Sequence, residues 1–293
     1  MEPTSSANDS NDRVQSAAPD RDDTGLGDGL TDISPGNGEE AVVKEEFKLS
    51  YSNWMLSKGL ERAETDICTI CSLPFEFPAA RHSLLNVCCM TKICKGCCVA
   101  AHRRSAVDGC LSCGTPHPRD DASIVQMVWE RVGKGDARAI SYLATKYYHG
   151  SHGLAKDFPL AFELYKKAAR LGSSEAHFCL GNFYYNGADD VEKREGNKVR
   201  GINHWQQAAM RGHVLSRHNL GVVEISNGNC KLAMQHFVIS AKMGCEESLN
   251  AIKTMFKDGQ VSEAQYAGVL TGYQDAMKEM KSPEREEAKQ LGV

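Results

Sequence analysis

Long hydrophobic runs, aromatic residues and an excess of charge of either sign are all scarce in this 293-residue sequence. A helix needs about 20 apolar residues to cross a bilayer, and the runs here are only a few residues long, so we expect no membrane span. Aromatic residues make up 7% of the chain and the formal net charge is −4, which argues against a basic, base-stacking face for nucleic acid. The opening residues MEPTSSANDSNDR have no basic start and no apolar core, so we expect no secretory signal and an intracellular protein, cytoplasmic or nuclear.

Large apolar side chains are also nearly missing from residues 1–46, which are rich in Ser, Asn, Asp, Gly and Pro. The first 43 residues carry ten acidic residues against two arginines. Such a segment cannot bury enough surface to offset its chain entropy. The sequence therefore predicts a disordered acidic tail over residues 1–46.

Cysteine, in contrast, is plentiful, and eight of the 12 cysteines lie in pairs within one short stretch. The pairs are Cys68-x-x-Cys71, Cys88-Cys89, Cys94-x-x-Cys97 and Cys110-x-x-Cys113. In a reducing compartment, clustered thiols indicate metal ligands rather than disulfides. Eight ligands are the number that two tetrahedral zinc ions need. We therefore predict two zinc ions on these eight cysteines, in a domain over 67–120 of a size that usually needs a metal to fold.

Cys88 and Cys89 are the least regular pair, because adjacent side chains do not easily reach one ion. His82 is an alternative ligand for one of them, and Cys98 or His102 for the other. The sequence leaves these alternatives open.

The cysteine spacing resembles that of a RING finger in its all-cysteine variant: pairs separated by 16, four and 12 residues, opening with CTICSLPF at 68–75. The resemblance implies a cross-brace, in which the first and third pairs hold one ion and the second and fourth hold the other. It also implies a surface for a ubiquitin-conjugating enzyme, formed by Ile70 and by Val99 of the central helix. Leu111 and Gly114 stand where the family usually has a proline and a cation, so the scaffold matches better than the features of an active ligase.

Helical patterns fill the rest of the chain. A connecting helix is predicted over 121–135, with Ile124, Val125, Val128, Trp129 and Val132 on the face that caps the first repeat. Upstream, residues 47–66 predict a linker or a short helix that covers the metal domain, with Trp54 in a packing role.

Four similar segments, each ending in glycine, follow in the helical repeat domain predicted over 136–293. They span 137–150, 174–187, 214–228 and 246–259, and each precedes a second amphipathic segment, at 157–172, 198–212, 230–244 and 262–280. This period is that of a helix-turn-helix solenoid. The motif Ala-x-x-x-Leu-Gly-x-x-Tyr-x-x-Gly at 176–187 and the Lys-Ala-Ala-x-x-Gly closure at 167–172 resemble Sel-one-like repeats, relatives of tetratricopeptide repeats. That resemblance implies a groove for protein partners.

The predicted fold is therefore mainly α: an acidic tail, a small two-zinc RING-like domain and an α-α solenoid. The whole arrangement resembles a group of RING-repeat proteins found in diatoms and related algae. No catalytic constellation is visible in the repeats, where lone histidines and Cys179, Cys230 and Cys245 are expected to pack. Two hypotheses follow: a RING-type ubiquitin ligase that recruits substrates through its repeats, and a zinc-stabilised interaction scaffold without ligase activity.

Overall fold

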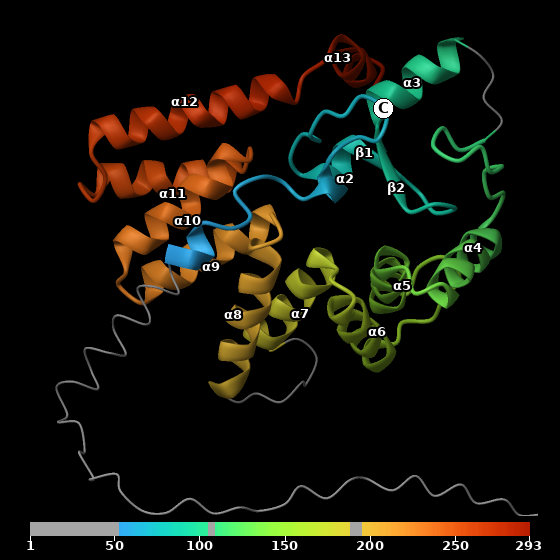
Figure 1. The fold of residues 1–293 in the computed structure, drawn as a ribbon, viewed down its shortest axis with the longest axis horizontal. Helices are drawn as coiled ribbons and strands as arrows, with labels where there is room; N and C mark the ends of the chain where they lie inside the picture. Colours follow the sequence, from blue (N-terminus) through green and yellow to red (C-terminus); the bar gives the residue numbers. More distant parts are fainter. Residues whose placement is uncertain (1–52, 105–108, 188–194) are drawn as a thin grey trace, which may run out of the picture. The chain divides into compact units, whose positions relative to one another are not determined.

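A computed structural model describes residues 53–104, 109–187 and 195–293, with the side chains of 195 and 196 left out (Figure 1). The predicted tail at 1–46 and the first residues of the 47–66 segment lie outside the described residues. The described residues all belong to one compact unit by their internal contacts. No helix in the described part of the chain combines the length and apolar character that a bilayer span requires.

The cysteine-rich part folds around one β-hairpin. We call residues 64–104 and 109–118 the cysteine module; its elements are η1 (Glu64–Asp66), α2 (Ala79–His82), β1 (Ser83–Asn86), β2 (Thr91–Cys94) and α3 (Lys95–Arg104). The strands pair antiparallel, from Ser83 opposite Cys94 to Asn86 opposite Thr91. The hairpin therefore delivers one cysteine pair at its tip and another where β2 enters α3.

The remaining chain is a series of helices, which confirms the predicted mainly helical repeat fold. They are α4 (Asp121–Gly133), α5 (Ala137–His149), α6 (Phe158–Arg170), α7 (Ser174–Asn186), α8 (Glu195–Ala209), α9 (Val214–Ser226), α10 (Cys230–Lys242), α11 (Glu246–Lys257), α12 (Glu263–Glu279) and α13 (Pro283–Gln290). Helices α5 to α12 correspond to the four predicted pairs.

Small residues let the paired helices approach closely. Gly181 of α7 lies so near Trp205 of α8 that an added Cβ would be 2.3 Å from the indole Cδ1. Ala208 and Ala209 are fully buried beside it. Gly150 and Gly187 end their helices with φ of 67°, the left-handed conformation that glycine adopts without strain.

Helix α4 packs on α5 as expected, but through a narrower face than predicted. Val128 and Val132 are buried, and Ile124 and Met127 pack beside them. Trp129 is 44% exposed, so its assignment to the buried face is wrong. Successive residues of an α-helix are about 100° apart around its axis, so Trp129 points away from the side on which Val128 packs against α5.

The segment before the cysteine module lies on the repeats rather than over the metal-binding residues. A helical turn at 53–56 buries Met55 among Trp205, Ala209, Leu220 and Val223, whereas Trp54 is 49% exposed. The buried Arg217 of α9 donates to the carbonyl oxygens of Met55, at 3.0 Å, and Lys58. The packing role expected of Trp54 therefore belongs mainly to Met55.

Candidate metal centre

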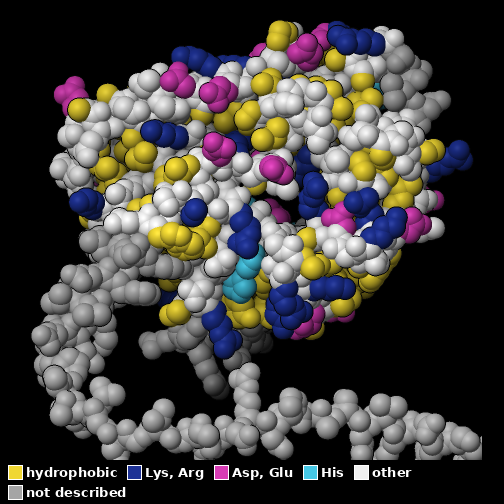
Figure 2. Space-filling view, viewed as in Figure 1, with side chains coloured by type: hydrophobic (Ala, Val, Ile, Leu, Met, Phe, Trp, Pro, Cys, Tyr) yellow, Lys and Arg dark blue, Asp and Glu magenta, His cyan; other side chains and the backbone are white. Residues whose placement is uncertain are grey.

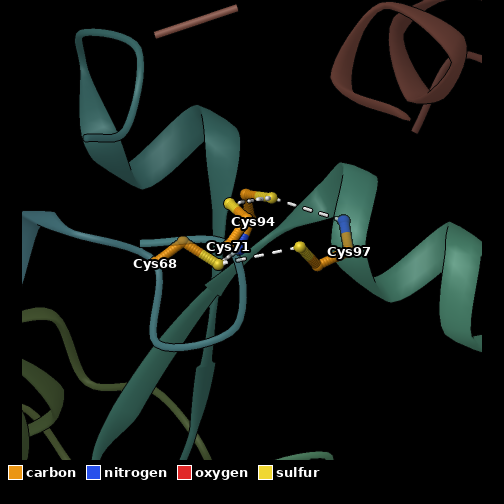
Figure 3. Close-up of side chains that lie close together, drawn as sticks. All are labelled: Cys68, Cys71, Cys94 and Cys97. Carbon is orange, nitrogen blue, oxygen red and sulfur yellow. Dashed lines mark hydrogen bonds between the residues drawn. The ribbon is translucent and has the colours of Figure 1, made fainter. Parts of the chain in front are cut away.

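Four sulfurs from three parts of the module meet behind the hairpin. Cys68 and Cys71 come from the loop after η1, Cys94 ends β2, and Cys97 lies in the first turn of α3. Figure 3 shows these four side chains pointing toward one another. The Cys68 and Cys97 sulfurs are 3.9 Å apart, as are those of Cys71 and Cys94. We call these residues the first tetrad.

The second tetrad consists of Cys88, Cys89, Cys110 and Cys113. Its sulfurs are 3.4 Å apart for Cys88 and Cys113, and 3.7 Å apart for Cys89 and Cys110. The grouping of the eight sulfurs is the interleaved order that the RING resemblance implies. The metal assignment itself remains a prediction.

The hairpin turn explains how two adjacent cysteines reach one tetrad. Cys88 and Cys89 lie at its tip, where the amides of Cys89 and Met90 both donate to the Asn86 carbonyl. Met90 has a φ of 55°, which tightens the turn before β2 begins. The alternative ligands lie elsewhere: His82 lines a small cavity between the module and α13, and Cys98 lies 3.6 Å from His102 along α3.

The sulfur geometry fits zinc. Four sulfurs at the usual Zn–S distance of 2.3 Å in a tetrahedron are about 3.8 Å apart. All sulfur atoms within each tetrad lie within 4.8 Å of one another, and all eight cysteines are free thiols rather than disulfides. Backbone amides also point at sulfur, from Cys94 to Cys68 Sγ at 3.2 Å and from Cys97 to Cys94 Sγ at 3.3 Å. Such donors stabilise thiolates, the form in which cysteine binds metal.

The thiols of the tetrads have widely separated proton affinities. A hydrogen bond from the Cys94 thiol lowers the pKa of Cys68 to about 4, whereas burial raises the pKa of Cys97 to about 12. In the second tetrad, hydrogen bonds from Thr115 lower the pKa of Cys113 to about 6. A metal ion entering either tetrad would therefore displace protons from the remaining thiols.

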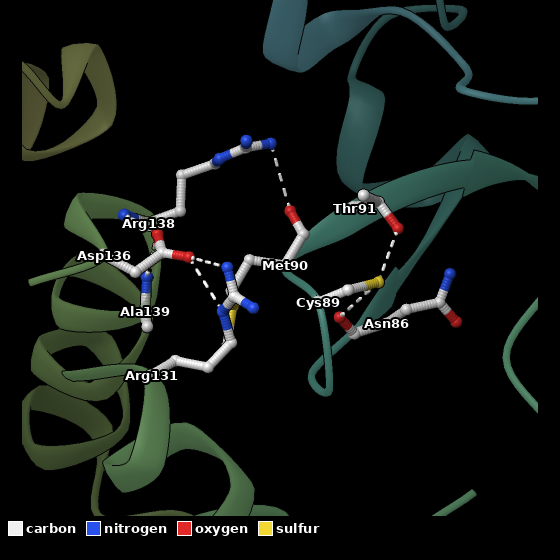
Figure 4. Close-up of polar contacts among 8 residues, drawn as sticks. All are labelled: Asn86, Cys89, Met90, Thr91, Arg131, Asp136, Arg138 and Ala139. Atoms are coloured by element: carbon white, nitrogen blue, oxygen red, sulfur yellow. Dashed lines mark hydrogen bonds and ion pairs between the residues drawn. The ribbon is translucent and has the colours of Figure 1, made fainter. Parts of the chain in front are cut away.

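The module is built into the repeats. Val87 and Met90, on the turn that carries Cys88 and Cys89, join the apolar core of α4 to α7. In Figure 4, Arg138 at the start of α5 reaches the Met90 carbonyl, at 3.1 Å. The same view shows Cys89 Sγ 2.9 Å from the Thr91 hydroxyl. On another side, Phe77 packs with Val214 and Cys245 between later repeats.

The proposed enzyme-contact residues differ in accessibility. Ile70 is 48% exposed, whereas Val99 is half-buried on α3. Gly96 and Arg103, one turn on either side of Val99, both contact α13. Residues three and four apart share a helix face, so Val99 belongs to the side of α3 that α13 covers. Leu111 packs partly against the first tetrad, and Gly114 is exposed.

Sequence reasoning missed α13 and its Arg285. The signal was present: Ser282 caps the helix and Pro283 occupies its first turn, a frequent combination at helix starts. Arg285 is 5% exposed and lies against the first tetrad, 3.5 Å from Cys71 Sγ. Its partners in the cysteine module, Cys71, Leu73 and Pro74, are more than 200 residues away in sequence.

The polar residues of the repeats mostly behave as expected. His177 and His204 approach each other at 2.9 Å, and His218 contacts Ser248. His236 is the exception: it is fully buried, and neither ring nitrogen has a partner among the described residues. Of the three repeat cysteines, Cys245 is buried, while Cys179 and Cys230 are only partly so. Figure 2 shows Lys and Arg interspersed with acidic and apolar side chains on the face in view.

Comparisons with known proteins find similarity over part of the chain. The chain is 22% identical over 166 residues to chitin synthase regulatory factor 4 of Schizosaccharomyces pombe, which covers 56% of this chain and 25% of that protein. The chain thus spans about a quarter of that relative's length.

Two solved structures are also similar. A Sel1 repeat protein from Oxalobacter formigenes is 20% identical, with a TM-score of 0.45, over 56% of this chain and 64% of that chain. A protective antigen of uropathogenic Escherichia coli with an SLR fold is 20% identical, with a TM-score of 0.45, over 65% of this chain and 38% of that chain. The Sel1 repeat family model matches residues 137–173 and 174–213, so the chain carries Sel1 repeats at α5–α6 and α7–α8.

Proposed function

We propose that this protein is a zinc-stabilised scaffold for protein–protein interaction, in which the eight tetrad cysteines bind two zinc ions and the repeats bind protein partners. The observation that carries the proposal is the position of the cysteine module, whose two thiol tetrads have tetrahedral spacing and whose surface packs into the repeats. Zinc would supply a fixed tetrahedral crosslink with no redox chemistry of its own.

The module makes structural contacts at widely separated points of the solenoid. Met90 enters the core of the first repeats, Phe77 packs beside Val214, and α13 lies on α3. A small unit with these contacts acts as a brace between repeats, because its own apolar cluster is limited to a few side chains around Phe75. Crosslinking it with metal would then stabilise the repeats as well.

Part of the repeat surface is already occupied by the chain itself. Met55 fills an apolar site on α8 and α9, and Gly59 lies against the backbone of Ala209 and Gly212. A protein partner of the repeats therefore has to bind outside this face or displace the 53–63 segment.

Native mass spectrometry of the full chain tests the metal part of the proposal. We expect a mass increase of two zinc ions that disappears on denaturation. A protein with one ion or none would contradict the eight-ligand assignment.

Ubiquitin ligase activity is the second candidate, and the exposure of Ile70 favours it. A RING ligase performs no chemistry with its own side chains; it holds the charged conjugating enzyme in a reactive pose. Ile70 projects from the first Cys-x-x-Cys loop and is available to such a partner. The covered side of α3 at Val99 and the missing cation at Gly114 favour the scaffold instead.

Auto-ubiquitination with a panel of conjugating enzymes separates the two candidates. For a ligase, Ile70→Ala abolishes the activity with two zinc ions still bound, while Leu84→Ala, at a 39% exposed apolar residue on β1, leaves it unchanged. For the scaffold, no conjugating enzyme of the panel gives activity.

A further inference from the structure

One buried arginine connects the last helix of the chain to the first tetrad. Arg285 of α13 donates to the carbonyl oxygens of Pro74, at 2.5 Å, and Leu73, at 3.1 Å. It also donates to its own chain at Met280, at 2.6 Å, and lies 3.5 Å from Cys71 Sγ. The guanidinium thus binds the loop that follows Cys71 by hydrogen bonds and contacts a sulfur of the tetrad.

A buried guanidinium needs a compensating negative charge, because desolvation costs several kcal/mol per ion. Among the described residues, Arg285 forms no ion pair with a carboxylate, and its Nε has no partner. Besides backbone carbonyl oxygens, the group that it meets is the sulfur of Cys71, which becomes a thiolate when the tetrad binds metal. Four thiolates on one divalent ion carry a net charge of −2, which leaves a negative charge for Arg285 to balance.

We propose that Arg285 is the outer-sphere cation of the first zinc site, and that zinc in the first tetrad and docking of α13 stabilise each other. The proposal rests on the zinc binding put forward above. Arg285 is a positioning residue here: it donates to a ligand sulfur and fixes the loop that carries it, which is how outer-shell groups tune metal affinity. The coupling is reciprocal, because metal that favours docked α13 must itself be favoured by it.

Other contacts of α13 orient the helix without touching sulfur. Arg103 pairs with Glu287, and Lys289 lies 2.8 Å from the buried carboxylate of Glu76. Arg103 is 55% exposed, and exposed pairs contribute little to stability. Arg103 therefore provides a matched control: the same interface and the same charge, but no ligand contact.

No Lys or Arg side chain of the described residues donates to a sulfur of the second tetrad. In the described part of the chain, its sulfurs meet neutral groups of Asn86, Thr91, Ser112 and Thr115 besides one another. The effect of Arg285 should therefore be confined to one of the two zinc ions.

Zinc release to a chromophoric chelator, measured on the full chain, tests the proposal. Arg285→Met should speed release of one ion about 10- to 100-fold and leave the other unchanged. Arg285→Lys should give an intermediate rate, and Arg103→Met should stay close to the wild type. In a Cys113→Ser background, where the first tetrad holds the remaining zinc, the acceleration should persist. An unchanged rate in Arg285→Met would overturn the proposal.

Hydrogen exchange of α13 in the wild-type chain gives a second measurement that needs no variant. Chelation should remove the protection of α13 amides before that of α5 to α8; equal protection with and without metal would overturn the coupling. A wild-type protein that binds no zinc would contradict the proposed function itself. Two zinc ions with no effect of Arg285→Met would contradict only the role of Arg285.

Discussion

The two tetrads offer the same four ligands in different surroundings. In the first, Cys68 and Cys94 are fully buried, and a β-strand, α3 and α13 enclose the site. In the second, Cys113 is exposed, Cys88 and Cys89 are partly exposed, and the ligands come from a hairpin turn and a loop. Identical ligands can therefore have different tasks, because the neighbours decide how much of the fold depends on the metal.

Replacing one cysteine in each tetrad, in separate variants, should show the largest difference in stability between the two sites. Cys68→Ser should lose one zinc ion, undock α13 and lower the free energy of unfolding by about 3 kcal/mol or more, since a buried ligand set is left incomplete. Cys113→Ser should also lose one zinc ion but lose less than half as much stability. Native mass spectrometry and urea unfolding measure both; equal losses of stability would show that the surroundings are irrelevant.

The close approach of α13 gives a second way to separate the tetrads. A Cβ at Gly96 would lie 2.6 Å from the Arg285 backbone nitrogen, so Gly96→Ala should destabilise the docked helix by about 1–3 kcal/mol. Zinc release from the first tetrad should quicken, and release from the second should not. Gly268→Ala is the control: this helical glycine has open space around it, and the change should be neutral or stabilising by up to about 1 kcal/mol.

A lower pH should destabilise the repeats through His236, independently of the two tetrads. Burial, with the nearby charge of Arg217, lowers the pKa of His236 to about 3. Below pH 6.5 the unfolded chain takes up a proton that the folded chain refuses, so stability falls between pH 6.5 and 3, by at most about 1.4 kcal/mol per pH unit. His236→Gln should flatten this slope in unfolding experiments. The wild type and His236→Gln have the same tetrads, so zinc release contributes equally to both slopes and cancels in their difference. Parallel slopes would contradict the lowered pKa of His236.

A neutral outer contact of the second tetrad should matter least. The Thr91 hydroxyl lies 2.9 Å from Cys89 Sγ, and Thr91→Val removes it with little change in shape. We expect zinc release from the second tetrad to quicken by at most about tenfold, with stability nearly unchanged. An effect as large as that of Arg285→Met would mean that charge is not what distinguishes the two sites.

Local patterns made much of this arrangement predictable. Cysteine spacing marks the pairs that form the tetrads, and glycines at helix ends mark the repeats, because each signal lies within a few residues. The interleaved grouping came from the RING resemblance, since spacing alone does not say which pairs meet. The error at Trp129 arose because Val128 and Trp129 are adjacent apolar residues. On a short amphipathic helix, a buried face that includes Trp129 fits the apolar pattern almost as well as one that leaves it out.

The long-range contacts were out of reach for the same reason. Met55 reads as one more apolar residue in a linker, and Arg285 as one charge in the polar helix PEREEAKQ. Only the fold shows that Met55 meets Trp205 and that Arg285 meets Cys71. A single sequence carries no signal for such pairs.

The separation of 214 residues between Cys71 and Arg285 has a consequence for synthesis of the chain. Ribosomes add about 5–20 residues per second, so roughly 10–40 s pass between emergence of the first cysteines and emergence of their arginine. For most of that interval the four cysteines of the first tetrad have been translated but Arg285 has not. Metal delivered early would meet an unfinished site, which Arg285 in the first turn of α13 would complete.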